Sequence, residues 1–164
     1  MNLWRWLFGP ADDEDGYEPD DDTGGWEHLP DRDCGCTPCT KRWQAAVHEA
    51  GHIVAYDHYG EEWLWAEINE GHGLVKSGPG ELEADGVYVY MVIGQAGDVA
   101  EEMVLGAAVG SGGDAANVAA LAARWGDPDG ETRAWDDATD LVAANLDAVE
   151  GYADELFEKG VIYP

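Results

Sequence analysis

Apolar residues recur every three or four positions over residues 41–59, which is the spacing of an amphipathic helix. The recurring apolar positions are Trp43, Val47, Ala50 and Val54. Thr40 stands just before them and is a residue type that commonly caps a helix N-terminus. Gly60 follows the last of them, as at many helix ends. The pattern therefore predicts a helix over 41–59, with Thr40 as its N-cap and its end near Gly60.

Shorter apolar runs follow in residues 63–90, where they indicate β-strands. The β-like pieces are Trp65–Ile68, Gly73–Val75 and Val87–Tyr90. Glycine and proline residues separate these pieces, as expected for turns. The sequence therefore predicts one small sheet inserted after the first helix.

Helical spacing returns in the second half of the chain. The predicted helices cover Met91–Leu105, Ala115–Trp125 and about 132–159. Gly106 would stop the first of these, and Gly151 is a candidate interruption in the last. The predicted fold class is α+β and mainly helical, with an HExxH helix, a small inserted sheet and a C-terminal helical bundle.

The N-terminal residues differ in composition from the rest. Residues 1–8 are rich in aromatic side chains, whereas residues 11–33 are acidic, contain several glycines and prolines, and predict a disordered linker. We interpret residues 1–8 as a docked or frayed terminus, or as a weak contact with a membrane surface. The folded domain is expected over 40–164, after a short cysteine cluster at 34–39.

Charge and length limit the possible functions. The chain has 164 residues, which fits one domain, and its 35 acidic against 8 basic residues give a net charge of −27. Such a surface repels phosphate backbones, so nucleic-acid binding is excluded. Apolar runs do not approach the roughly 20 residues of a transmembrane helix, and the start does not resemble a secretory signal. We therefore expect a cytoplasmic protein, either an ordinary acidic one or one from a halophilic source.

The sequence His48-Glu49-Ala50-Gly51-His52 lies within the first predicted helix. Histidines four residues apart lie on one helix face, so both imidazoles can reach a single ion. Glu49 could then take a proton from metal-bound water, whose pKa zinc lowers towards neutral. The motif predicts a zinc site with His48 and His52 as ligands and Glu49 as general base; the alternative is two surface histidines.

A catalytic zinc needs a third protein ligand. His58 follows His52 by six residues, the spacing of the metzincin motif HExxHxxGxxH, but Ala55 stands where that motif has glycine. On a continuing helix His58 lies about 15 Å along the axis from His48 and cannot share its ion. His58 therefore remains only an alternative third ligand.

A longer part of the chain, about residues 40–160, resembles the peptidase domain of FtsH-type zinc metalloproteases. The sequence HEAGH stands at 48–52, followed by Gly97-Asp-Val-Ala-Glu-Glu102, Gly106, Gly110-Ser-Gly-Gly-Asp114 and an alanine-rich helix. The resemblance implies a zincin-like fold in which Asp114 joins His48 and His52 as the third zinc ligand. It further implies that Glu101 or Glu102 orients a ligand histidine, and that the piece near Trp65–Ile68 is an edge strand that holds an extended peptide.

The ATPase module that usually accompanies this peptidase has no counterpart in the chain, which lacks G-x-x-x-x-G-K-[ST]. We therefore expect an ATP-independent metalloendopeptidase that cuts flexible or unfolded polypeptides. A separate unfoldase or a homo-oligomer would be its partner. The alternatives are a catalytically silent regulatory or binding module of the same fold, and a metzincin-type hydrolase that uses His58.

All three cysteines of the chain stand close together, at Cys34, Cys36 and Cys39. With His28 they would suit a small metal or redox cluster. The other interpretations are a disulfide between two of them and an inhibitory thiolate that occupies the open position of the zinc.

Overall fold

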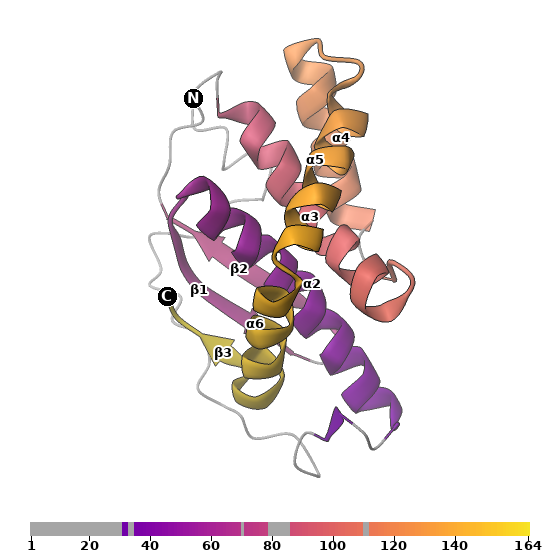
Figure 1. Ribbon diagram of the computed structural model, residues 1–164, viewed down its shortest axis with the longest axis vertical. Helices are drawn as coiled ribbons and strands as arrows, with labels where there is room; N and C mark the ends of the chain where they lie inside the picture. Colours follow the sequence, from indigo (N-terminus) through magenta and orange to yellow (C-terminus); the bar gives the residue numbers. More distant parts are fainter. Residues whose placement is uncertain (1–30, 33–34, 70, 79–85, 110–111) are drawn as a thin grey trace.

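The computed structural model describes residues 31–32, 35–69, 71–78, 86–109 and 112–164. Within these ranges the chain forms five helices and a three-stranded antiparallel sheet (Figure 1). The elements are α2 (Thr37–Tyr59), β1 (Trp63–Ile68), β2 (Gly73–Ser77), α3 (Val87–Leu105), α4 (Gly112–Trp125), α5 (Gly130–Ala144), α6 (Leu146–Lys159) and β3 (Val161–Ile162). The predicted mainly helical α+β class is confirmed.

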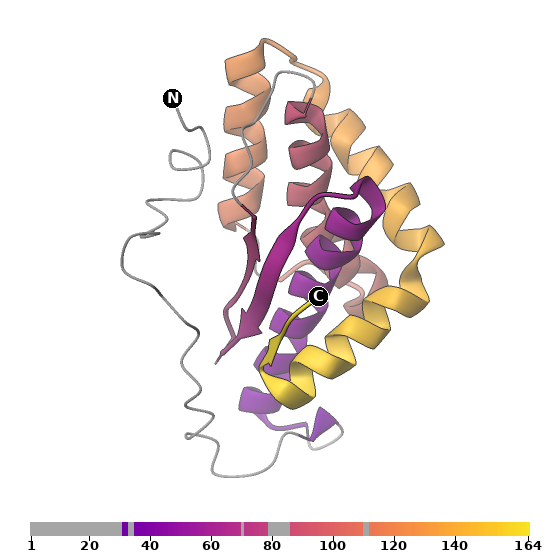
Figure 2. The same cartoon turned by 90° about the vertical axis from the view of Figure 1, so that its left-hand side faces the viewer.

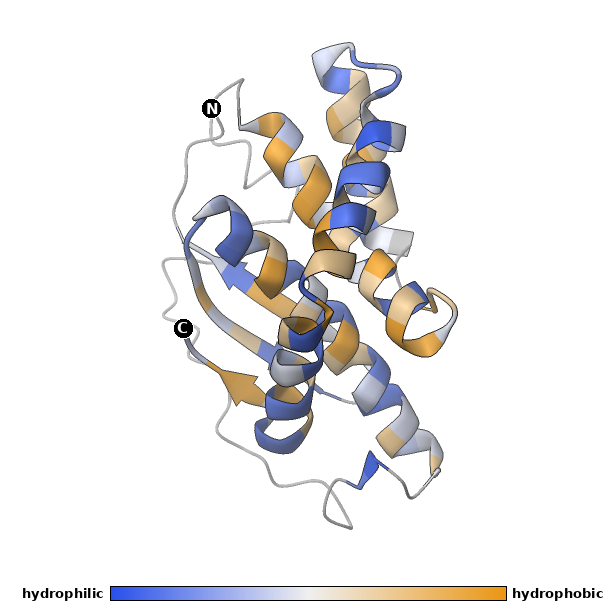
Figure 3. Ribbon diagram, in the orientation of Figure 1, coloured by the Kyte–Doolittle hydropathy of each residue, from blue (hydrophilic) through white to orange (hydrophobic). Residues whose placement is uncertain are grey.

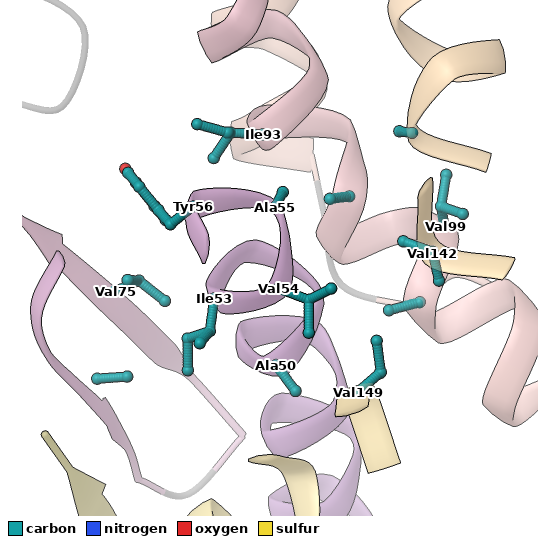
Figure 4. Packing of buried hydrophobic residues seen from close by; sticks show 14 of the residues in the cluster. Ala50, Ile53, Val54, Ala55, Tyr56, Val75, Ile93, Val99, Val142 and Val149 are labelled. Carbon is teal, nitrogen blue, oxygen red and sulfur yellow. The ribbon is translucent and has the colours of Figure 1, made fainter. Parts of the chain in front are cut away.

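Helix α2 lies between the sheet and the other helices, and the helices cover one face of the sheet (Figure 2). Ile53 points from α2 towards Val75 of β2, whereas Val54 points away from the sheet (Figure 4). Because α2 has neighbours on both sides, it is buried over most of its circumference from Ala45 to Tyr56. Burial on both sides explains why small apolar residues surround the histidine motif.

The first helix begins earlier than the sequence predicts. Thr40 is not its N-cap; Cys36 is, and Pro38 occupies the first turn, where its missing N–H costs nothing. The Thr40 hydroxyl instead donates a hydrogen bond to the Cys36 carbonyl at 3.0 Å. The predicted end is confirmed, because α2 runs without a break through Ala55 and stops at Gly60, which is left-handed (φ 68°).

Val87–Tyr90 is not a strand but the first turn of α3. Val87, Tyr90 and Met91 are buried, at helical spacing, while the two residues between Val87 and Tyr90 are only half-buried. Packing of this face against the helical core outweighs the β-propensity of valine and tyrosine. The predicted end of this helix, at Gly106, is confirmed.

The third strand of the sheet is β3 at the C-terminus, which the sequence analysis missed. It pairs with β1 through Ala66 opposite Ile162 and Glu67 opposite Val161. Strand β1 therefore lies between β2 and β3, and the prediction that Trp65–Ile68 is an edge strand is wrong. Among the described strands, β2 occupies the edge nearest the histidine motif.

The predicted last helix is two helices, and Asn145 separates them rather than Gly151. Asn145 leaves helical geometry (φ −125°, ψ 24°), and its side-chain amide donates a hydrogen bond to the Leu141 carbonyl at 2.8 Å. The bend lets both helices bury an apolar stripe, because Val142 of α5 and Val149 of α6 are fully buried. Their outward faces are largely hydrophilic (Figure 3).

Most of the predicted N-terminal segment, including residues 1–8, lies outside the described residues. Arg32 is described: it forms an ion pair with Asp154 at 3.0 Å, and its guanidinium lies 4.0 Å from the centre of the Trp43 ring. In the described part of the chain, helices fall short of the length and apolarity needed to cross a membrane.

Candidate metal centre

His48 and His52 lie one turn apart on α2 with their side chains buried under α3. Their Nε2 atoms are 3.1 Å apart, and their rings meet edge to face. Gly97 of α3 passes directly over both rings: a Cβ atom there would lie only 2.7 Å from each Nε2. A residue without a side chain at position 97 is thus required for α3 to close over the histidines.

Asp114 reaches the same point from the first turn of α4. Its Oδ2 atom lies 3.0 Å from Nε2 of His48 and 3.6 Å from Nε2 of His52. Tetrahedral zinc with bonds of about 2.0–2.1 Å separates its ligand atoms by roughly 3.3–3.4 Å. The structure therefore brings the three predicted ligands into a triangle of suitable size for one metal ion.

The other nitrogen of His52 determines which tautomer its ring adopts. Nδ1 lies 2.8 Å from the backbone carbonyl oxygen of Ile93. Since a carbonyl oxygen can only accept, Nδ1 carries the proton and donates it in this bond. In the neutral ring Nε2 then keeps its lone pair for a metal ion.

The other nitrogen of His48 faces two buried carboxylates on α3. Nδ1 lies 3.4 Å from Oε1 of Glu101 and 3.7 Å from Oδ1 of Asp98, and the three residues form a second group that could hold a metal ion. Of the two glutamates considered from the sequence, Glu101 faces the histidine and Glu102 is exposed. Sequence analysis missed Asp98; its spacing of three residues from Glu101 in an apolar helix was the available signal.

Glu101 also connects α3 to the segment before α4. Its Oε2 atom accepts a hydrogen bond from the backbone N–H of Val109, five residues before Asp114. One carboxylate therefore contacts His48 and restrains the segment that leads to Asp114. This link helps to explain how side chains from α2 and α4 meet.

The cluster attracts positive charge. Burial alone would lower the pKa of His48, but the hydrogen bond with Asp114, the nearby Glu101 carboxylate and the charge of Glu49 raise it to about 11. Burial also acts to lower the pKa of His52, but the hydrogen bond with Asp114 acts in the opposite direction, and the pKa of His52 is raised. Burial would raise the pKa of Asp114, and the two histidines lower it. Without a metal, the site therefore retains protons that a metal ion would displace.

Glu49 lies beside the ligand atoms, where α2 meets the edge strand. Its carboxyl group fills the space next to Gly73 of β2, where a Cβ atom would lie 2.7 Å from Cδ of Glu49. Burial raises the pKa of the Glu49 carboxyl, while the charges of His52 and His48 act in the opposite direction. Glu49 also lines a cleft of about 360 Å³ that reaches His48 and Asp114, so the centre is open on this side.

The remaining candidate ligands lie away from this centre. His58 is exposed in the last turn of α2. Cys39 is buried in the first turn of α2, and its nine-residue separation from His48 corresponds to about 13 Å along the helix. Cys36 is farther still, so neither thiol reaches the ligand atoms; Cys34 and His28 lie outside the described residues.

Comparison with protein families and curated proteins assigns no relative to the chain. It matches none of the protein-family models and none of the curated proteins with which it was compared. The likeness to FtsH-type peptidases therefore depends on the motifs quoted from the sequence, and the function must be argued from the geometry of the site.

Proposed function

We propose that the protein is a zinc-dependent metalloendopeptidase with a zincin-like site. One observation carries the proposal: a buried carboxylate, Glu49, lies beside three ligand atoms 3.0–3.6 Å apart at the end of an open cleft. Metal sites with a purely structural role are closed, and they need neither an open side nor an adjacent base. Support for a catalytic site thus comes from Glu49 and the cleft together.

The donor set favours zinc. Two imidazoles and one carboxylate, with a fourth position left open, form a common ligand set of catalytic zinc. The edge-to-face histidines and the Ile93 carbonyl would fix both rings before the ion arrives, which favours binding. When bound, zinc would polarise a substrate carbonyl and lower the pKa of water.

Residues of the chain would transfer the proton and orient the zinc ligands. Glu49 would accept the proton of the attacking water and then donate it to the departing amine nitrogen, as a general base and then a general acid. The raised pKa of Glu49 suits this exchange, because a base works best when its pKa is near the working pH. Glu101 and Asp98 would hold the ring of His48 from its far side.

The substrate would be a polypeptide in extended form. Strand β2 is the free edge of the described sheet nearest the site, and Gly73 at its start touches Glu49. A peptide added to this edge would pass the ligand atoms. An extended strand is accessible in flexible or unfolded segments, which would be the substrates; a separate unfoldase or a homo-oligomer would supply unfolding of folded ones.

Replacement of Glu49 by Gln tests the proposal. Zinc content should be unchanged, because Glu49 is not a ligand, while hydrolysis of an unfolded protein should fall about 10²–10⁴-fold. Glu102→Gln, on the exposed face of α3, is the matched control and should keep full activity. Proteolysis that persists in Glu49→Gln, or its absence from the zinc-loaded native protein, would contradict the proposal.

A further inference from the structure

Two hollows of unlike character meet at the candidate metal centre. One is the cleft of about 360 Å³ and the other a cavity of about 120 Å³. Glu49, Gly73 and Asp114 line both of them. A peptide bond placed at the ligand atoms would therefore lie next to both hollows, which would be available to the residues that flank it.

The cavity has mainly apolar walls. Its lining includes Tyr56 from α2, Val75 from β2 and Ile93 from α3, and Figure 4 shows the three elements from which these residues come. Its volume is slightly below the roughly 150 Å³ of a buried apolar cavity that binds benzene. A leucine or methionine side chain fits such a space, whereas tryptophan is too large and a carboxylate would lose its hydration without replacement.

The outer end of the cleft offers hydrogen-bond donors. Lys41, Gln44 and His72 line it, and the alkyl chain of Lys41 lies over Gly71. Within the described part of the chain, Lys41 is the one lysine or arginine for which no hydrogen bond, ion pair or ring contact is found. An ammonium group on the wall of the cleft, without such a contact, can pair with a carboxylate group that a ligand brings.

We propose that the site selects a peptide bond with a leucine-sized apolar residue on one side and a carboxylate group on the other. The apolar side chain enters the cavity, and the carboxylate meets Lys41 and His72 in the cleft. The carboxylate is an aspartate or glutamate side chain, or the C-terminal carboxyl group of the peptide. This inference rests on the proposed peptidase function.

Short peptides with a single varied bond test the selection. One pair of C-terminally amidated peptides contains the bond Glu-Leu or the bond Leu-Glu. Further peptides replace Leu by Ala or by Trp, and a separate set replaces Glu by Gln. In the preferred order, either Leu replacement should lower kcat/KM at least about tenfold. The Gln replacement should lower it about fivefold, as expected for an exposed ion pair. A Gln peptide that regains the rate when it ends in a free carboxyl group identifies the terminal carboxylate as the ligand.

Variants of the two hollows should change selectivity separately. Ile93→Ala enlarges the cavity and should reduce the preference for Leu over Trp at least about fivefold. Val92→Ala, a truncation of its buried neighbour outside the cavity lining, should leave that ratio unchanged. Lys41→Gln should abolish the preference for Glu over Gln, and Lys159→Gln, which removes an exposed ion pair elsewhere, should not.

A binding measurement separates failure of the inference from failure of the peptidase proposal. Calorimetry on the zinc-loaded protein compares acetohydroxamate with hydroxamates that carry an isobutyl or an indolylmethyl group. Tighter binding of the isobutyl compound alone supports the cavity, even if peptides are not cut. Equal binding of all three compounds, or cleavage without side-chain preference, would overturn the inference about selectivity but not the proposal of a metal centre. If the protein neither cleaved the peptides nor bound any hydroxamate, both proposals would be overturned.

Discussion

The two sides of the His48 ring carry the same kinds of group but differ in exposure. On the Nε2 side, the Asp114 side chain is 28% exposed and shares a metal-sized space with His52. On the Nδ1 side, the side chains of Asp98 and Glu101 are 6% and 3% exposed. Both sides could hold a cation by their donor atoms; they differ in exposure and in the second imidazole, which only the Nε2 side has.

This difference indicates how the site divides its tasks. Ligand exchange with solvent or substrate needs an open position. The cleft is lined by Asp114 and Glu101 but not by Asp98, and of the two carboxylates that line it only Asp114 is substantially exposed. On the closed side, Nδ1 of His48 and Oδ1 of Asp98 are buried without a hydrogen-bond partner among the described residues. A cation on Nε2 would strengthen the attraction between the Nδ1 proton and these carboxylates. We therefore propose that a metal ion binds on the Nε2 side and that the carboxylates on the Nδ1 side orient the His48 ring.

Among changes on the two sides of the His48 ring, loss of Asp114 should lower zinc affinity the most. Asp114→Ala leaves two histidine ligands, so zinc affinity should fall by more than the roughly 10–100-fold typical of supporting residues. Chelator competition measures the affinity. The control is His58→Ala, which removes the exposed alternative ligand and should leave affinity unchanged. Zinc lost in His58→Ala and kept in Asp114→Ala would contradict the assignment.

A smaller effect is expected on the supporting side. Glu101→Gln should lower zinc affinity about 10–100-fold, because it weakens the hold on His48 and on the segment before α4. Glu102→Gln, its exposed neighbour, should change nothing. If Glu101→Gln lost zinc as completely as Asp114→Ala, Glu101 would be a ligand and the division between the two sides would fail.

Zinc affinity should also depend on pH. Metal binds neutral imidazole, and the metal-free site keeps protons because the pKa of His48 is raised to about 11 and that of His52 is raised too. Binding below these pKa values must release protons, so affinity should increase with pH, about tenfold per unit for each proton released. Competition titrations at about pH 7, 8 and 9 measure the slope. Histidines of ordinary pKa, near 6.5, would give almost no slope there.

The parts of the site that were predictable from sequence are those fixed by one helix. His48, Glu49 and His52 share α2, and their spacing alone sets which face they occupy. The continuation of α2 through Ala55, which removes His58 from the centre, followed from the same local reasoning. The prediction of Asp114 came from the family resemblance, and its approach to His48 depends on packing between α2, α3 and α4.

The features that sequence analysis missed depend on distant partners. The spacing of Asp98 from Glu101 places both on one face of α3, but only the position of α2 shows that this face meets His48. Val87–Tyr90 has the composition of a strand, yet it forms the first turn of α3, because helical geometry lets Val87 and Tyr90 pack together against the core. The bend at Asn145 separates α5 from α6, and the two-residue strand β3 pairs with β1 after α6 ends. Both depend on packing between segments far apart in the sequence.

X-ray absorption at the zinc edge of the metal-loaded full chain tests the central claim most directly. The account predicts about one zinc per chain, with a first shell of nitrogen and oxygen at about 2.0–2.1 Å and the outer scattering of two imidazoles. Asp114→Ala should lose this signal. A shell dominated by sulfur at about 2.3 Å, which would place zinc on the cysteines, or the absence of stoichiometric zinc, would contradict the account.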